Sequence, residues 1–281
     1  MLLSEKHIKQ FACFYLLCFL LNFGWFWWNG LLFSSLDPVF FFNSLDFTRN
    51  ILMLSNLQHA LLNNRWLRVT FDVIYLLLPL ILTLAVLLNF KIKKGIAFIT
   101  IGFTIVYAIF FSSVSYISMQ GYMSWILIPL ILSSTTIQGF YYYLHVVRII
   151  FILMFVAAAV QKLYSGAIFN TDQMSGILLK QHAVYLVSNA EDWFTKFIYF
   201  LVQHKITAFA FYIMGTLAEL ILVIGLFTRR YDRILLVVFC AFLFADYFLM
   251  QIYYFIWLAF TGCFYFSYFS LDDKMEYKKL L

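Results

Sequence analysis

Charged residues are scarce throughout this chain. Of its 281 residues, 11% are Asp, Glu, Lys or Arg, whereas 64% are hydrophobic. No stretch carries the polar surface that a water-soluble domain requires, so the composition excludes a soluble globular protein. It predicts a single integral membrane domain over residues 1–281.

The motifs of several common chemistries are also missing. The four cysteines lie inside apolar runs without the Cys-x-x-Cys spacing of a redox pair, which predicts inert thiols. No His-x-x-x-His, Glu-x-x-His or clustered Cys/His spacing occurs, so no metal site is predicted. A Gly-rich phosphate loop and the Gly-x-Ser-x-Gly elbow of hydrolases are absent as well. Basic runs are no longer than residues 91–94, and we expect no nucleic-acid partner.

Long, continuously apolar runs are what the chain has in quantity. A helix of about 20 residues crosses the hydrocarbon core of a bilayer, and such runs favour helices over the alternating pattern of a β-barrel. The predicted fold is therefore an all-α polytopic membrane protein. Its clear spans are residues 11–33, 73–90, 95–117, 147–164, 207–227 and 234–251.

Two further spans follow from the division of longer apolar stretches. Residues 121–165 are too long for one helix, and the polar patch at 133–139 predicts a turn between two. The stretch 234–269 divides near Gln251 in the same way, which leaves a last span over residues 253–269. The predicted number of spans is eight, with six and seven as alternatives.

The distribution of Lys and Arg predicts the orientation. With a cytoplasmic N-terminus, twelve of these residues lie on the inner side and seven on the outer side. We therefore expect a bacterial inner-membrane protein, surrounded by membrane lipids, with both termini in the cytoplasm.

Two long segments then lie on the outer side. Residues 34–71 have apolar residues at near-helical spacing and predict an amphipathic helix on the membrane. Residues 165–205 form the most polar stretch of the chain and predict a functional outer loop. A partner membrane protein or secreted protein would dock at such outer segments.

A charged residue inside a span costs about 2.5–3.5 kcal/mol, so each one asks for an explanation. The candidates are Lys162, Glu219 and Asp246, with Arg148 and Asp72 nearer the ends of spans. One interpretation places the first three around a polar cavity, with Lys162 as a catalytic base and the two acids orienting it or a substrate. The other interpretation is an ion pair between Lys162 and either acid that fixes helix packing, or a lysine that extends to the interface.

Three more residues are candidates for substrate binding. His145 precedes Arg148 by three residues, so the two can share one face of a helix. His182 lies in the outer segment 165–205.

Two stretches carry short motifs. Residues 148–166 contain the run Ala-Ala-Ala-Val-Gln-Lys-Leu, which includes Lys162, and residues 218–230 place Glu219 ahead of a Thr-Arg-Arg turn. The first resembles a helix of the HTTM family, the membrane domain shared with vitamin K-dependent γ-carboxylases, and the second is similar to a later HTTM helix. DoxX-like proteins carry a comparable Glu helix. The resemblance covers about residues 140–250.

The resemblance implies a γ-carboxylase-like activity. Lys162 then matches the base that acts on reduced vitamin K, which implies a quinone or hydroquinone as the cofactor. Two departures limit the match. Asp246 stands where many relatives have a His, and the chain lacks the extracellular β-rich region with which full carboxylases hold their peptide substrates.

The leading hypothesis is thus an HTTM-like enzyme that acts on or with a quinone or another lipid-phase substrate. A non-enzymatic membrane subunit, which docks a partner protein through its outer segments, is the alternative. A transporter that uses Glu219 and Asp246 as a proton relay ranks third, because no pair of Gly- or Pro-broken helices indicates an inverted repeat.

Overall fold

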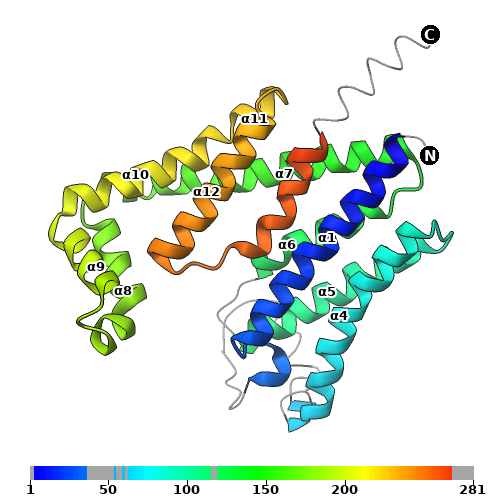
Figure 1. Ribbon diagram of the computed structural model, residues 1–281, viewed down its shortest axis with the longest axis horizontal. Coiled ribbons are helices and arrows are strands. Elements are labelled where there is room, and N and C mark those ends of the chain that lie inside the picture. Colours follow the sequence, from blue (N-terminus) through cyan, green and yellow to red (C-terminus); the bar gives the residue numbers. More distant parts are fainter. Residues whose placement is uncertain (1–2, 37–53, 55–58, 61–62, 115–118, 268–281) are drawn as a thin grey trace. The chain divides into compact units, whose positions relative to one another are not determined.

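The computed structural model describes residues 3–36, 54, 59–60, 63–114 and 119–267 (Figure 1). Within these ranges the chain is helical and contains no strand, so the predicted all-α fold is confirmed. The helices are α1 (Leu3–Trp28), α4 (Arg65–Leu87), α5 (Lys93–Val114), α6 (Met123–Leu132), α7 (Ile137–Tyr164), α8 (Gln173–Ser188), α9 (Trp193–Gln203), α10 (Lys205–Ile221), α11 (Ile224–Phe227) and α12 (Asp232–Met250). Short 3-10 helices occupy Phe33–Ser35, Met119–Tyr122, Ala167–Phe169 and Phe255–Phe260.

Six of the described helices are long and apolar enough to cross a membrane, as a polytopic membrane protein requires. These spans contain α1, α4, α5, α7, α10 and α12. Two shorter apolar helices, Met123–Leu132 and Phe255–Ser267, take the places of the two spans obtained by division. The chain leaves its helices at 133–136 and at 251–254, where those divisions were predicted.

Helix α4 begins at Arg65, eight residues before the predicted span. The side chain of Asn64 caps it, because Asn64 Oδ1 accepts hydrogen bonds from the backbone N–H groups of Trp66 and Leu67. An N-cap of this kind starts a helix independently of hydropathy, which explains why an apolar pattern alone places the boundary too late.

The predicted outer segments have different outcomes. Residues 165–205, predicted as a functional outer loop, contain the two helices α8 and α9. Most of the amphipathic helix predicted over residues 34–71 lies outside the described residues. Helix α7 begins at Ile137, ten residues before the predicted span, so Arg148 lies well inside the helix and not near its start.

The described residues fold into two compact units. Unit 1 takes those up to Val147 together with Ile256–Phe266, and unit 2 takes Arg148–Phe255 and Ser267. Helix α7 contributes residues to both units. Residues 140–250 fall almost entirely within unit 2.

Unit 1 encloses a buried acid among aromatic side chains. The rings of Tyr75 and Tyr107, on α4 and α5, stack with their centroids 4.1 Å apart. The Tyr107 hydroxyl donates a hydrogen bond to Asp72 Oδ1 at 2.7 Å, and the backbone N–H of Ser34 donates to Oδ2 at 2.8 Å. Asp72 is 3% exposed, so these two bonds offset part of the cost of removing its carboxylate from water.

Replacement of Tyr107 by Phe should therefore destabilise the protein. Tyr107→Phe leaves Asp72 Oδ1 without this donor, and we expect the free energy of unfolding to fall by about 1–3 kcal/mol. Thermal unfolding in detergent, followed by tryptophan fluorescence, measures the change. Tyr142→Phe is the matched control, because Tyr142 is 67% exposed. Equal unfolding midpoints for the two variants would contradict the contribution of the Tyr107 hydroxyl.

Candidate functional site

An ion pair joins α7 to α10 within unit 2. Lys162 Nζ donates to both carboxylate oxygens of Glu219, at 2.9 Å to Oε1 and 2.8 Å to Oε2. The side chain of Glu219 is 6% exposed and that of Lys162 is 28% exposed. Helix α7 ends at Tyr164, and Gly166 follows in the left-handed conformation that commonly terminates helices, with φ +73°. Lys162 therefore lies near the end of α7, whereas Glu219 lies fourteen residues after the start of α10. The lysine is the more accessible partner.

A second acid and two tyrosines lie around this pair. The Lys162 amine is 5.6 Å from the centroid of the Tyr212 ring, a cation–π arrangement. Asp246 of α12 is 9% exposed and interacts electrostatically with Lys162 and Glu219. Its carboxylate makes no hydrogen bond or ion pair with a described residue. Tyr254, in the turn after α12, has its pKa raised to about 12 by burial and by the negative charges of Asp246 and Glu219.

The helical hairpin α8–α9 is anchored beside this group. His182 of α8 is 1% exposed, and its Nε2 lies 2.8 Å from the backbone oxygen of Leu249, to which the ring donates an N–H. Leu249 lies in the last turn of α12, three residues after Asp246. The hairpin shares a hydrophobic core with α10, formed by Met174, Leu178, Leu186, Ile198, Leu201, Ala208 and Tyr212. Tyr212 thus contacts both the hairpin and the Lys162 amine.

This arrangement is suited to acid–base chemistry. The Lys162 ammonium uses two N–H groups on Glu219, and the third has no acceptor among the described residues. A substrate oxygen can accept a charge-assisted hydrogen bond from it. Asp246 supplies a carboxylate that can take up a proton nearby. Among the described residues, no three His, Cys, Asp or Glu side chains converge to hold a metal ion.

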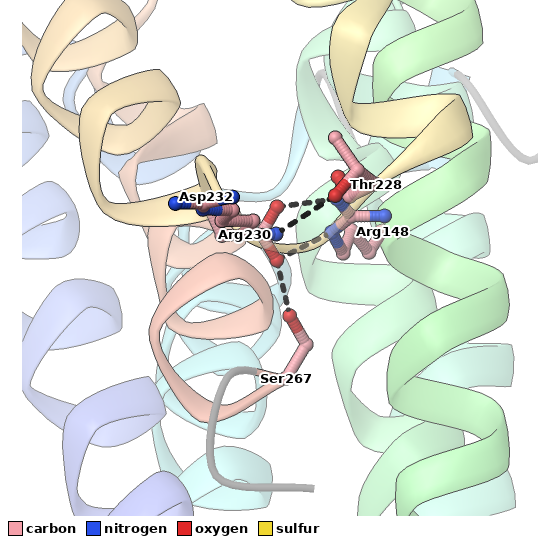
Figure 2. Close-up of polar contacts among 5 residues, drawn as sticks. All are labelled: Arg148, Thr228, Arg230, Asp232 and Ser267. Carbon is pink, nitrogen blue, oxygen red and sulfur yellow. Dashed lines mark hydrogen bonds and ion pairs between the residues drawn. The ribbon is translucent and has the colours of Figure 1, made fainter. Parts of the chain in front are cut away.

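A second ion pair lies about 21 Å back along α7, given the fourteen residues between Lys162 and Arg148. Arg148 and Asp232 are both fully buried. Arg148 Nε donates to Asp232 Oδ2 at 2.9 Å, and Nη2 donates to Oδ1. Nη2 also donates to the carbonyl oxygen of Thr228, while the Ser267 hydroxyl donates to Asp232 Oδ2 at 2.7 Å (Figure 2).

The backbone around this second pair is closely packed. A Cβ atom on Gly225 would lie 2.7 Å from Ile152 Cδ1 and 3.2 Å from Arg148 Nη2, so a side chain at this position would have to displace the ends of these neighbouring side chains. In the following loop, burial and the positive charge of Arg148 lower the pKa of Arg229. Arg148 is thus engaged in joining α7 to the segment between α11 and α12.

The predicted site residues fall into two groups. Lys162, Glu219 and Asp246 lie together, with His182 beside them. Arg148 belongs to the separate buried pair, and His145 is half-buried in unit 1.

Sequence reasoning missed Asp232, Tyr212 and Tyr254. Asp232 lies at the start of an apolar run, where an acid favours a helix N-terminus. This position is the sequence signal that could have identified it. The two tyrosines carry no such signal, because the chain has 19 Tyr and only the fold selects these two.

A scan against protein-family models, a search of curated proteins and a search of solved structures each found no match to this chain. The site is therefore interpreted from its own geometry.

Loss of the cation of the buried pair should strongly destabilise the protein. Arg148→Met leaves Asp232 buried without its partner, and we expect the free energy of unfolding to fall by about 3–5 kcal/mol. Thermal unfolding in detergent measures the loss. Lys196→Met is the control, because it breaks an ion pair with Glu191 whose side chains are 65% and 97% exposed, and such pairs contribute little.

The double variant Arg148→Met/Asp232→Leu removes both buried polar groups and should recover much of the stability lost in Arg148→Met. A loss at Arg148 no larger than that at Lys196 would contradict the structural role of the pair.

Proposed function

We propose that the protein is an integral membrane enzyme of the HTTM type that performs acid–base chemistry on a lipid-phase substrate, with a quinone or hydroquinone as the expected class. The observation that carries the proposal is the Lys162–Glu219 pair with Asp246 beside it, three charged groups contributed by three spans. Ionisable groups placed in membrane spans are rare and commonly mark functional sites.

Lys162 would supply the electrostatic part of the chemistry. Glu219 holds its ammonium group through two hydrogen bonds, and the remaining N–H would bind a substrate oxygen and stabilise negative charge as it develops there. This role differs from that of the base expected in the sequence analysis, because the amine acts here as a hydrogen-bond donor to Glu219.

Asp246 is the better candidate for the base. The proton of a substrate hydroxyl would pass to the Asp246 carboxylate, and the oxyanion left behind would be hydrogen-bonded to Lys162. The raised pKa of Tyr254 keeps its hydroxyl protonated at neutral pH, so that it can act as a further donor in the same region. A hydroquinone has the acidic hydroxyl that this step requires.

The position of the site suits a molecule dissolved in the bilayer. Lys162 lies in the last turn of α7 and Asp246 near the end of α12, both of which are spans. A substrate with an apolar tail among the lipid chains and a hydroxyl at its polar end would reach this depth. An inner-membrane location, with the site on the outer side and both termini in the cytoplasm, rests on the distribution of Lys and Arg.

Removal of the Lys162 amine should weaken the binding of a quinone. Loss of a charged hydrogen bond costs about 1.5–3 kcal/mol, so we expect Lys162→Met to lower the affinity for a short-chain ubiquinone by about 10- to 100-fold. Titration of the purified protein in mild detergent, with lipid extraction to count bound quinone, measures this. Lys196→Met serves as the control with the same chemical change at an exposed position.

An unchanged affinity in Lys162→Met would contradict the role of the amine. A protein that holds no quinone and copurifies with another polypeptide at fixed stoichiometry would favour the non-enzymatic subunit instead.

The role of Asp246 is tested separately from binding. Deprotonation accelerates the oxidation of a hydroquinone by O₂, so O₂ uptake with decylubiquinol reports on the base. We expect Asp246→Asn to bind the quinone but to lower the protein-dependent rate by on the order of a hundredfold. Asp172→Asn is the control, because Asp172 pairs with Lys205 at the surface. Equal rates in the two variants would exclude Asp246 as the base.

A further inference from the structure

The hairpin α8–α9 connects two spans but is too short to be a span itself. Its helices have 16 and 11 residues, or about 24 Å and about 17 Å at 1.5 Å per residue, whereas the hydrocarbon core is about 30 Å thick. Only His204 separates α9 from α10, and α8 begins nine residues after α7 ends. The hairpin is therefore held at the level where α7 and α10 reach the membrane surface.

One face of the hairpin packs against the rest of unit 2. Leu178, Ile198 and Leu201 are buried in the core that includes Tyr212 of α10. The hydrogen bond from His182 to the Leu249 carbonyl ties the same face to the end of α12. The opposite side of both helices is exposed within unit 2, except where Trp193 stacks on Phe248 of α12.

The opposite face exposes large apolar side chains, and their contact with water would cost free energy. On α8, Val184 is 82% exposed and Val187 is 83% exposed. On α9, Trp193, Tyr199 and Phe200 are 65%, 43% and 48% exposed. Each apolar Å² left in water costs about 25 cal/mol, so five such side chains on two short helices indicate contact with something less polar than water.

The kinds of residue on this face match the membrane interface. Trp and Tyr concentrate where lipid headgroups meet the acyl chains, and Lys side chains placed among them extend their amines toward the headgroups. Lys180 and Lys196 lie exposed on the same two helices. Trp193 also stacks on Phe248 of the span α12, with ring centroids 6.3 Å apart, so the face is continuous with the lipid-facing side of a span.

We infer that the α8–α9 hairpin is an interfacial element whose outer face, formed by Val184, Val187, Trp193, Tyr199 and Phe200, is embedded among the lipid headgroups and upper acyl chains. The occupant of this face is the bilayer. The outer face continues through Trp193 onto Phe248 of α12. Because α12 is a span whose exposed side chains contact lipid, this continuity argues for lipid over a partner protein.

The position of the hairpin restricts which substrates can reach Lys162. This step rests on the proposed function. Tyr212 belongs to the hairpin core and the Lys162 amine lies over its ring, so a hairpin at the interface places this amine close to the level of the lipid headgroups. The substrate would then be a membrane amphiphile that presents its polar end at this depth and enters sideways from the bilayer.

Nitroxide labels on the hairpin test the inference without any assay of activity. In proteoliposomes, and in a background free of the four native cysteines, we would compare Val184→Cys and Phe200→Cys with Glu191→Cys in the turn. The ratio of collision rates with O₂ and with a water-soluble nickel chelate reports depth. We expect this ratio to be larger by about twofold or more at Val184 and Phe200 than at Glu191, because O₂ concentrates in lipid.

A second measurement keeps the natural cysteines. The difference between the fluorescence of the unmodified protein and of Trp193→Phe isolates the emission of Trp193, and phosphatidylcholine brominated high in the acyl chain should quench it more than lipid brominated near the chain end.

Two results would overturn the inference. Labels at Val184 and Phe200 that favour the nickel chelate would place the hairpin in water, and labels reached by neither collider would mean that another protein covers it. Either result leaves the quinone titration of Lys162→Met unaffected, so failure here is distinguishable from failure of the proposed function.

Discussion

A charge that leaves water for the interior of a membrane protein must find its compensation within the protein, and unit 2 is organised by this constraint. It meets the constraint in two different ways on one helix. Around Arg148, one cation faces one acid, and the flat guanidinium matches the two carboxylate oxygens of Asp232. Around Lys162, one cation faces two acids. In the first arrangement the positive and negative charges balance, and the pair joins two helices. In the second, the Asp246 carboxylate makes no hydrogen bond or ion pair with a described residue.

Unit 1 meets the same constraint without a cation at its acid. Asp72 is compensated by a phenol and a backbone N–H, while Arg68, one helical turn earlier on α4, donates to the carbonyl oxygen of Leu36. Neutral donors suffice here because both carboxylate oxygens are bonded and the surrounding rings exclude water. An intramembrane acid is therefore not by itself evidence of a site. What distinguishes Asp246 is that its carboxylate has charged neighbours and accepts no hydrogen bond from a described residue.

The sequence predicts the parts of this fold that depend on length and hydropathy. Apolar runs identify the helices, and the polar patch at 133–139 and Gln251 mark their ends. The pattern does not predict features that depend on a single side chain or on contacts far along the chain. Asn64 starts α4 early through a cap, and Arg148 finds its partner 84 residues later. Lys162, Glu219 and Asp246 stand out in the sequence because charge is so rare there, but which acid binds the lysine follows only from how α7, α10 and α12 pack.

The imbalance at Lys162 also accounts for where the site lies. Two acids and one lysine at the centre of a bilayer would cost far more than the same groups near its surface, where water and lipid headgroups lower the penalty. Lys162 and Asp246 lie near the ends of α7 and α12, and in the proposed interfacial placement the α8–α9 hairpin covers this level with a face that lipid can accept. A balanced pair has no such restriction, and Arg148 with Asp232 can remain fully buried. At Lys162 the two acids outnumber the one cation, which lowers stability, and a lysine N–H is available to an incoming oxygen. A catalytic or binding role explains this arrangement better than helix packing does.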